Sequence, residues 1–378
     1  MRVAIATETD AGESRVAASP DSVRKLVGLG ASVAIQAGAG VKAGVPDDEF
    51  AKAGADIVAD APAALKGADI VLAVRRPAEA RLKGVTPGAL VLGIMDPYGH
   101  EAELAGLAGA QVQAFAMELM PRITRAQSMD VLSSQANLAG YRAVLDGAAA
   151  YGRALPMMMT AAGTIPAARV FVMGVGVAGL QAIATARRLG AIVTATDVRP
   201  ATKEQVESLG AKFIAVEDDE FRQAETSGGY AKEMSTEYRA KQAALVAAHI
   251  AKQDIVITTA LIPGRPAPKL VDAGMIASMR PGSVIVDLAV ERGGNVEGSS
   301  AGKIVQMGGV ALVGDSSALR LASSASSLYA RNLLAFVETL IDKDGKKVSV
   351  NYDDELVKAT LLTKDGAVVH PNFQPKTA

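Results

Sequence analysis

A short connector between two apolar runs carries more directional hydrogen-bonding groups than a connector requires. It is "PRITRAQSMD", from Pro121 to Asp130, and it contains two arginines, a glutamine, a serine and an aspartate. It has no glycine, the residue that gives a backbone most freedom. The alternative is a connector that is simply held by salt bridges. What these groups do therefore depends on the ligands that the rest of the chain can bind.

The strongest pattern lies further along the chain, in "ARVFVMGVGVAGLQAIATARRLGAIVTATD". Gly174, Gly176 and Gly179 have the G-x-G-x-x-G spacing between a predicted strand (170–173) and a predicted helix (177–189). The first glycine permits a tight turn, the second lets the backbone approach a pyrophosphate, and the third lets the helix pack close to the strand. Because a strand, a helix and a second strand follow in order, the pattern predicts dinucleotide binding rather than an isolated turn.

An acidic residue, Asp197, ends the next predicted strand (192–196). A carboxylate at this position accepts hydrogen bonds from the adenosine ribose and repels a 2′-phosphate, so it favours NAD over NADP. Arg199 follows two residues later and could pair with a 2′-phosphate, which keeps NADP as the alternative.

Two further strands support this unit. We expect "DIVITTA" to run out at Ala260 and Leu261, and "GSVIVDLAV" to run out at Val290. The carboxyl ends of parallel strands border the ligand, so Leu261 should lie beside the nucleotide. The polar segment that precedes these strands carries Gly229 and Tyr230. It is either a surface loop or a lid that closes on the cofactor, and its residues alone leave both open.

Composition excludes several classes of protein. The 378 residues are 49% hydrophobic and 21% charged, which is typical of a globular chain long enough for two domains. The net charge of −1 gives no bulk attraction to nucleic acid or to an anionic membrane. There is no cysteine, and the three histidines are not spaced as metal ligands, so we expect no metal site. No apolar run is long enough for a membrane span and no leader is recognisable, so we expect a cytoplasmic chain.

The elements that position these residues alternate between strands and helices, which predicts parallel sheets covered by helices. Two long helices are expected, over 132–150 and 323–341, and a chain that crosses twice between domains would use them as connections. The predicted fold is therefore α/β, with two doubly wound Rossmann-like domains joined by two long helices. One domain comprises 1–131 with 324–378, and the other comprises 132–323. The first has no glycine-rich phosphate loop, so its sheet is expected to be structural. Within it we predict a helix capped by Ser19 and stopped by Gly30, and a hairpin around Asp365.

A positioned acid–base pair is missing from the sequence. Dehydrogenases of hydroxy or amino acids move a proton as well as a hydride, and they carry a His or Lys for that purpose. Here we expect His100, His249 and His370 to be structural. Hydride transfer from one nicotinamide to another moves no proton on the substrate, and a site without an acid–base pair suits that reaction.

The chain resembles the NAD(H)-binding component of proton-translocating nicotinamide nucleotide transhydrogenase, a family related to alanine dehydrogenase. Nearly the whole chain carries the resemblance, and its segments include "MELMPRITRAQSMDVLSSQANLAGYRAV", "PMMMTAAGTIPAARVFVMGVGVAGLQ", "TDVRPATKEQVESLGAKF" and "TTALIPGRPAP". "RITRAQSMD" is specific to the transhydrogenase branch. Alanine dehydrogenases carry a Lys and a His where this chain has "AVRRP" (Arg75, Arg76) and "LGIMDP".

The resemblance implies a function and a set of partners. The chain would bind NAD(H) and transfer a hydride directly between NADH and NADP⁺ held by a partner component, coupled to proton translocation across the membrane. The partners would be the NADP(H)-binding and membrane-spanning components, and the chain would be a homodimer. It would lie in the cytoplasm, peripheral on the inner face of the plasma membrane. The alternatives are a free-standing NAD-dependent amino-acid dehydrogenase of the alanine type and a non-catalytic NAD-binding module.

The resemblance also implies roles for individual residues. The polar connector would border the nicotinamide, with Arg122 on phosphate or ribose and Gln127 toward the facing dihydronicotinamide. Asp130 and Ser133 would hold the carboxamide and the loop. The remaining cofactor contacts would come from Gly174, Gly176, Val177, Gly179, Asp197, Val198, Arg199, Gly229, Tyr230, Gln242 and Leu261.

Overall fold

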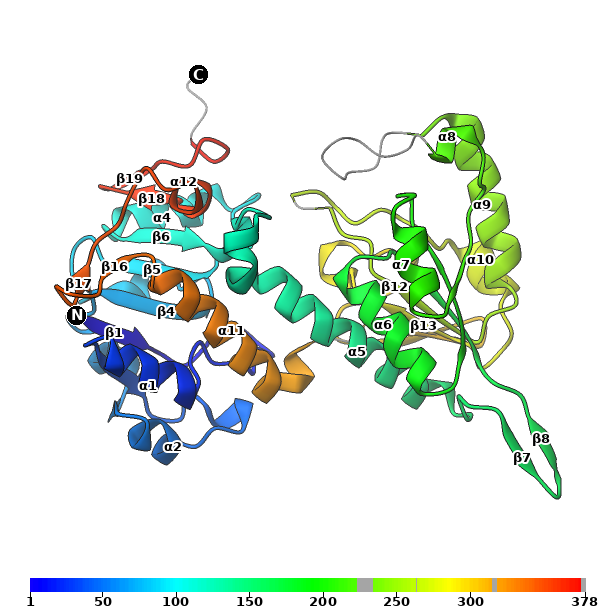
Figure 1. Ribbon diagram of the computed structural model, residues 1–378, viewed down its shortest axis with the longest axis horizontal. Coiled ribbons are helices and arrows are strands. Elements are labelled where there is room, and N and C mark those ends of the chain that lie inside the picture. Colours follow the sequence, from blue (N-terminus) through cyan, green and yellow to red (C-terminus); the bar gives the residue numbers. More distant parts are fainter. Residues whose placement is uncertain (223–233, 263, 315–317, 375–378) are drawn as a thin grey trace. The chain divides into compact units, whose positions relative to one another are not determined.

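The chain folds into two compact units in this computed structural model, which describes residues 1–222, 234–262, 264–314 and 318–374 (Figure 1). The first unit combines Met1–Gln135 with Leu319–Ala378, and the second is Ala136–Ala318. The chain leaves the first unit within helix α5 (Val131–Tyr151) and returns to it just before helix α11 (Ala322–Val337). The domain boundaries at 131/132 and 323/324 stay a prediction.

Each unit is built on one doubly wound sheet, so the predicted fold class is confirmed. The first sheet is parallel throughout and has the order β3-β2-β1-β4-β5-β6. Its strands are β1 (Arg2–Ile5), β2 (Ser32–Gln36), β3 (Ala55–Val58), β4 (Ile70–Arg75), β5 (Leu90–Ile94) and β6 (Gln113–Ala116). The strand order reverses between β1 and β4, and this is the switch point of the sheet.

Alternate residues of the first sheet enter two separate cores, as the period of two in a strand requires. Ile5, Leu72 and Leu92 face a core shared with α11 and with helices α1 (Pro20–Gly28) and α2 (Asp47–Lys52). Ala4 and Val91 face the opposite core. That core is shared with helices α3 (Ala61–Leu65) and α4 (Glu101–Gly109).

The predicted helix start at Ser19 is confirmed, because Ser19 and Ser22 form a reciprocal capping box before α1. Gly30 follows the helix with φ +85°, a left-handed conformation that suits glycine. The predicted hairpin is also confirmed. Strands β18 (Thr363–Lys364) and β19 (Ala367–Val368) pair across Asp365 and Gly366, which both have positive φ. The tail also contains helix α12 (Glu355–Thr360) and strands β16 (Ile341–Asp342) and β17 (Lys347–Val348).

The second sheet has the order β11-β10-β9-β12-β13-β15-β14, and only β14 is antiparallel to its neighbour. Its strand order reverses between β9 and β12, so its switch point lies there. Its strands are β9 (Arg169–Met173), β10 (Ile192–Thr196), β11 (Lys212–Phe213), β12 (Ile255–Thr258), β13 (Val284–Asp287), β14 (Ile304–Met307) and β15 (Val310–Val313).

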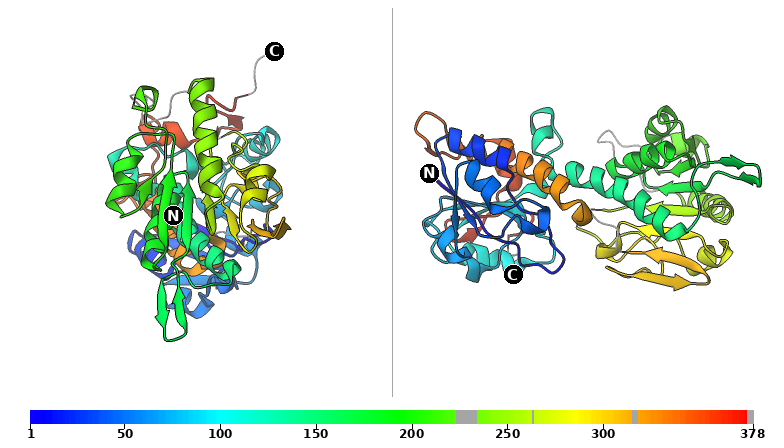
Figure 2. Two further views of the ribbon diagram at one scale, coloured as in Figure 1. Left: turned by 90° about the vertical axis from the view of Figure 1, so that its right-hand side faces the viewer. Right: turned by 90° about the horizontal axis from the view of Figure 1, so that it is seen from below.

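Helices cover both faces of this sheet as well. Alternation along β9 separates Val170 and Val172, which face α5, from Phe171, which faces the opposite core. Helices α6 (Val177–Arg188) and α7 (Thr202–Ser208) join α5 on the first face. Helices α9 (Thr236–Ile250) and α10 (Ala273–Ser278) cover the second face. A short helix α8 (Asp219–Arg222) precedes α9, and a hairpin of β7 (Met158–Thr160) and β8 (Gly163–Ile165) projects from the unit (Figures 1 and 2).

Some predicted boundaries were wrong. Helix α11 ends at Val337, before the expected 341, because the chain turns there into β16. Strands β12 and β13 end at Thr258 and Asp287, short of the expected ends at Leu261 and Val290. The apolar residues beyond each strand belong to loops. Strand β3 was missed, since its "ADIV" segment is short and only partly buried.

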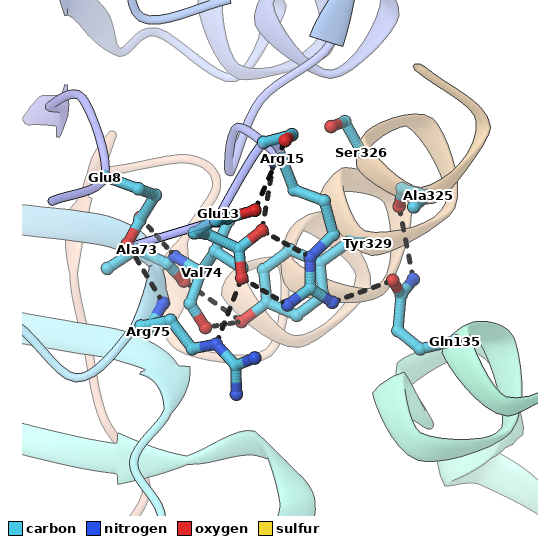
Figure 3. Close-up of polar contacts among 12 residues, drawn as sticks. Glu8, Glu13, Arg15, Ala73, Val74, Arg75, Gln135, Ala325, Ser326 and Tyr329 are labelled. Carbon is cyan, nitrogen blue, oxygen red and sulfur yellow. Dashed lines mark hydrogen bonds and ion pairs between the residues drawn. The ribbon is translucent and has the colours of Figure 1, made fainter. Parts of the chain in front are cut away.

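A buried polar cluster lies after β1 and β4 in the first unit (Figure 3). The carboxylate of Glu13 accepts hydrogen bonds from Arg15 Nη2 at 2.6 Å and Nε at 2.8 Å, and from Arg75 Nε at 3.0 Å. Arg15 also donates to Gln135 on α5, and Gln135 donates to the carbonyl of Ala325 on α11. Because the Glu13 and Arg15 side chains are almost fully buried, removal of one partner would leave an uncompensated charge.

The end of β4 is held from two further sides. Glu8 accepts hydrogen bonds from the N–H groups of Val74 and Arg75, at 2.7 Å and 3.2 Å. The hydroxyl of Tyr329 on α11 donates toward the carbonyl oxygens of Ala73 and Val74. These contacts fix α11 and the segment after β1 to the same strand. The cavity beside them measures ≈ 20 Å³, room for about one water molecule.

A pH-dependent stability difference should follow from Glu8. Burial raises the pKa of Glu8 from 4.5 to about 7, although the N–H groups of Val74 and Arg75 oppose the rise. The folded state then binds more protons than the unfolded state between these values, so the Glu8 contribution to stability falls as pH rises through that window. Glu8→Gln, which carries no charge, should gain melting temperature relative to wild type between pH 5 and pH 8.

Glu49→Gln is a matched control, because Glu49 is exposed on α2. Its melting temperature relative to wild type should not follow the same trend. A Glu8→Gln difference that is the same at pH 5 and pH 8 would show that Glu8 does not titrate in this window.

Candidate nucleotide site and polar connector

Each of the three glycines of the G-x-G-x-x-G pattern is required for a different physical reason. Gly174 follows β9 with φ +98°, so the turn needs a residue without a side chain. A Cβ built at Gly179 would lie 1.9 Å from the carbonyl oxygen of Gly174, so only glycine lets α6 pack this close. No described atom lies within 4 Å of a Cβ built at Gly176. The space in front of Gly176 and the N-terminus of α6 therefore fits a pyrophosphate group.

The loop after β12 lies against this turn. Thr259 Oγ1 donates to the carbonyl of Gly174 at 3.0 Å, and the N–H of Ala260 donates to Asn295 Oδ1 at the same distance. The fully buried Asn295 also donates to the carbonyl of Ala260. Leu261, which follows directly, is 52% exposed. The structure thus brings the residues before Leu261 beside the first glycine, at the switch point of the sheet.

A second anchor of this edge is Asp287, at the end of β13. Its buried carboxylate accepts hydrogen bonds from the N–H groups of Ala289, Asn295 and Val296 and from Ser299 Oγ.

Sequence reasoning missed Thr259, Asp287 and Asn295. The usable signal was a polar residue at the end of an otherwise apolar strand, as in "VIVD".

Asp197 stands where the fingerprint predicted it, after β10, but its carboxylate is occupied by the chain itself. Oδ2 accepts from the N–H of Val175 at 2.7 Å, and Oδ1 accepts from the N–H of Arg199 at 2.9 Å. The Arg199 guanidinium adds Nε on Oδ1 at 2.9 Å and Nη2 on Oδ2 at 3.0 Å. The Asp197 side chain is only 6% exposed. The predicted ribose acceptor and the predicted phosphate partner are therefore paired with each other.

The other predicted cofactor residues of this unit differ in exposure. Val177 at the first turn of α6 is 40% exposed, and Val198 is 54% exposed. Gln242 on α9 accepts from the N–H of Val216 and donates to Thr196 Oγ1, so its amide supports the end of β10. Gly229 and Tyr230, the predicted lid, lie outside the described residues.

The polar connector of the first unit forms the 3₁₀ helix η4 (Thr124–Met129), and much of it is anchored. Ala126 and Met129 are buried in the core that also contains α11. Arg125 pairs with Asp354 and Glu355 at the start of α12, at 2.6 Å and 3.1 Å. For Arg125, the structure therefore agrees with the alternative of a connector held by salt bridges.

The predicted site residues of the connector divide into two pairs. Asp130 accepts from the N–H of Ser133 at 2.9 Å and from its Oγ at 2.5 Å, so these two residues fix the start of α5. Arg122 and Gln127 are exposed, and neither side chain makes a hydrogen bond or ion pair with a residue that the structure describes. A rigid turn thus presents Arg122 and Gln127 at the surface of the first unit.

The histidines are held by structural contacts, as expected. His249 Nε2 lies 2.8 Å from Thr194 Oγ1, and its ring meets Phe171 edge to face. Burial lowers the pKa of His249 and of His370, which favours the neutral ring. His370 bonds to backbone groups of the tail, and His100 precedes α4 with Nδ1 2.8 Å from the carbonyl of Asp96.

Arg75 and Arg76, where the resemblance to alanine dehydrogenases would place a Lys, are both engaged by other groups of the chain. Arg75 is paired with Glu13, and Arg76 donates to the carbonyl oxygens of Met95 and Asp96. Among the described residues, no group of His, Cys, Asp or Glu is arranged to hold a metal ion. No helix in the part of the chain that the structure describes is long and apolar enough to span a membrane.

Comparison with known proteins assigns both segments of the chain. The model of the alanine dehydrogenase/PNT N-terminal domain matches residues 4–139, and that of the C-terminal domain matches residues 143–371. An NAD(P) transhydrogenase alpha-subunit chain of Rhodospirillum rubrum is 55% identical over 377 residues, which cover 98% of each chain. A transhydrogenase structure from Sinorhizobium meliloti is 61% identical with a TM-score of 0.89, covering 98% of this chain and 100% of that one. An L-alanine dehydrogenase structure is 25% identical with a TM-score of 0.82, covering 99% and 98%. The chain belongs to the alanine dehydrogenase/PNT family and, within it, to the NAD(P) transhydrogenase alpha subunits.

Proposed function

We propose that this chain is the NAD(H)-binding component of a proton-translocating transhydrogenase. It passes a hydride directly between NADH and NADP⁺ held by a partner component. The observation that carries the proposal is the open glycine loop of the second unit, with the N-terminus of α6 behind Gly176. The high identity to transhydrogenase alpha subunits supports the same assignment. NADH supplies the hydride, and the chain supplies its binding and orientation.

Each group of residues has a role in that task. The N–H groups at the start of α6 bind the pyrophosphate, and Asp197 accepts the adenosine ribose. Gly174, Val177 and Gly179 shape this phosphate site, while Val198, Gln242 and Leu261 border it. Gly229 and Tyr230 close over the cofactor. At the nicotinamide, Arg122 and Gln127 provide polar contacts, and Asp130 with Ser133 keeps the connector rigid.

In the described part of the chain, all three histidines are held by structural contacts, and this favours hydride exchange over the reaction of an alanine-type dehydrogenase. Arg75 and Arg76 are engaged in hydrogen bonds, and the cavity beside Glu8 has room for no more than about one water molecule. A substrate that must gain or lose a proton would need a His or Lys beside it. Hydride exchange between two nicotinamides has no such requirement. A non-catalytic NAD-binding module would have no use for the exposed Arg122 and Gln127 on a rigid turn.

The β7–β8 hairpin supports a homodimer. It leaves Met157, Met158, Met159 and Ile165 exposed, at 61%, 45%, 78% and 44%. A lone two-stranded hairpin is marginally stable in water, and apolar side chains on it are expected to be covered. We assign a second copy of this chain as the cover. The NADP(H)-binding and membrane-spanning components are the other partners, and they hold the chain at the inner face of the plasma membrane.

Cofactor choice is tested at Asp197. Asp197→Asn should weaken NADH binding and reduce discrimination against NADPH, because a ribose acceptor and a repulsive charge are lost. Asp254→Asn serves as a control, because Asp254 precedes β12 at its amino end and bonds the N–H of Arg169. Equilibrium titration with NADH and with NADPH gives the dissociation constant for each cofactor. NADH binding by Asp197→Asn as tight as wild type would place the ribose elsewhere.

The connector is tested by transfer rate against affinity. Gln127→Asn shortens an exposed side chain by one methylene and should leave the fold and the NADH dissociation constant nearly unchanged. Hydride transfer needs the reacting atoms about 3 to 3.5 Å apart, and a misplacement near 1 Å can cost about a hundredfold in rate. Stopped-flow transfer with the NADP(H)-binding component should therefore show a large loss.

Two further variants of the connector and one control variant complete this series. Asp130→Asn should also transfer slowly, and Arg122→Ala should both transfer slowly and bind NADH more weakly. Arg125→Ala removes the same charge from the same turn, but its side chain pairs with α12, so its transfer rate should stay near wild type. Wild-type rates for Gln127→Asn, Asp130→Asn and Arg122→Ala together would make the connector purely structural.

The dimer is tested at the hairpin. Wild-type protein should have the mass of a dimer in light scattering at micromolar concentration. Replacing Met158 and Met159 together with serine removes apolar contact area without touching either core, so the mass should shift toward the monomer. Val41→Ser, at an exposed apolar residue of the first unit, should keep the dimer mass. A monomeric wild type, or a variant with unchanged association, would contradict the hairpin interface.

A further inference from the structure

The Asp197 carboxylate has no acceptor site left for a ligand. A carboxylate offers about four lone-pair sites, and here four N–H groups occupy them, two on each oxygen. Two of the donors are backbone groups, from Val175 and Arg199. They are fixed, since Val175 belongs to the glycine turn and the Arg199 carbonyl is held by Thr202. A ribose can reach this carboxylate only if other donors leave it.

The two remaining donors belong to the Arg199 side chain, and they can leave. Nε occupies one carboxylate oxygen and Nη2 occupies the other. The Arg199 side chain is 31% exposed, so water is available to the guanidinium when it moves. The adenosine ribose of NAD carries two adjacent hydroxyl donors. At the carboxylate the exchange is balanced: two N–H groups depart, two O–H groups arrive, and each oxygen keeps one backbone donor. The hydrogen bond from Arg199 Nη2 to the carbonyl of Val175, at 3.2 Å, is also broken, and this adds to the cost of displacement.

We infer that Arg199 is a specificity-determining residue that occupies the ribose position at Asp197 and is displaced when NAD(H) binds. This inference rests on the proposed function, because it takes the adenosine ribose as the group that Asp197 receives. Displacement of the guanidinium costs binding energy, so Arg199 weakens the affinity for NADH that Asp197 alone would give.

Arg199 also reduces the selectivity of the site. A 2′-phosphate lacks the donor that a 2′-hydroxyl offers to Asp197, and it repels the carboxylate. The guanidinium opposes that repulsion, because it neutralises Asp197 and can itself pair with phosphate. Arg199 therefore lowers the preference for NAD(H) over NADP(H). The acid alone would discriminate more strongly than the acid–arginine pair.

Adenosine nucleotides test this directly, without the reaction. Competition against NADH fluorescence should show that Arg199→Ala binds 5′-AMP about twofold to fivefold more tightly than wild type, the upper part of the range for a partly exposed ion pair. It should bind 2′,3′-dideoxy-AMP no more tightly, because that ligand has no hydroxyl for Asp197. It should bind adenosine 2′,5′-bisphosphate more weakly than wild type does.

Three further variants separate the causes. Arg188→Ala removes one positive charge from the exposed end of α6 and should leave all three affinities unchanged. Arg199→Lys, with one point-like charge in place of the two-donor fork, should fall between wild type and Arg199→Ala. In the Asp197→Asn background, Arg199→Ala should give no gain for 5′-AMP, since the pair is already broken.

The outcomes distinguish this inference from the proposed function. Weaker or unchanged 5′-AMP binding by Arg199→Ala, or an equal gain for the dideoxy ligand, would overturn the displacement of Arg199 while leaving NAD(H) binding intact. Failure of wild-type protein to bind both NADH and 5′-AMP would instead overturn the proposed function itself.

Discussion

The close approach of α6 to the turn after β9 is the contact on which the nucleotide site depends. With 1.9 Å between the Gly174 carbonyl and a Cβ built at Gly179, any side chain there would push the helix away. The helix would then no longer direct its first N–H groups at the space before Gly176. The same turn receives Thr259 on one side and Asp197 on the other, through Gly174 and Val175. One glycine contact thus fixes the helix, the glycine loop and Asp197 together.

The two sheets have comparable switch points, and the chain uses them differently. In the first unit, Glu8, Glu13, Arg15 and Arg75 satisfy one another and the strand ends, and they leave a cavity of ≈ 20 Å³. That arrangement stabilises the sheet and fastens α11. In the second unit, the strand ends are capped by Thr259 and by the Asp287 and Asn295 network, while Gly176 stays uncovered. At the switch point of the first sheet the polar side chains bond to one another and to the strand ends. At that of the second sheet they surround a glycine loop that stays exposed.

Local patterns were enough to predict the glycine loop and the Ser19 cap, because each depends on neighbours within a few residues. The alternation of strands and helices predicted the two doubly wound sheets, and the resemblance carried by nearly the whole chain predicted the family. Most misses depend on partners distant in sequence, and no residue near Arg125 indicates that it pairs with Asp354. Arg199 is only two residues from Asp197, but the spacing alone does not show that its guanidinium pairs with that carboxylate. Strand β3 and the ends of β12 and β13 are decided by which neighbours pair with them. The roles of Arg122 and Gln127 remain predictions, although both are exposed on the anchored turn.

The most direct measurement of the account follows one hydrogen atom. NADH deuterated at the transferred C4 position is mixed with this chain, the NADP(H)-binding component and NADP⁺, and the NADPH formed is analysed by mass spectrometry. Direct hydride transfer predicts that deuterium from C4 is retained in the NADPH, with none lost to water and no dependence on added amino acid. Product without deuterium, or NADH formation from NAD⁺ and alanine by this chain alone, would contradict the account.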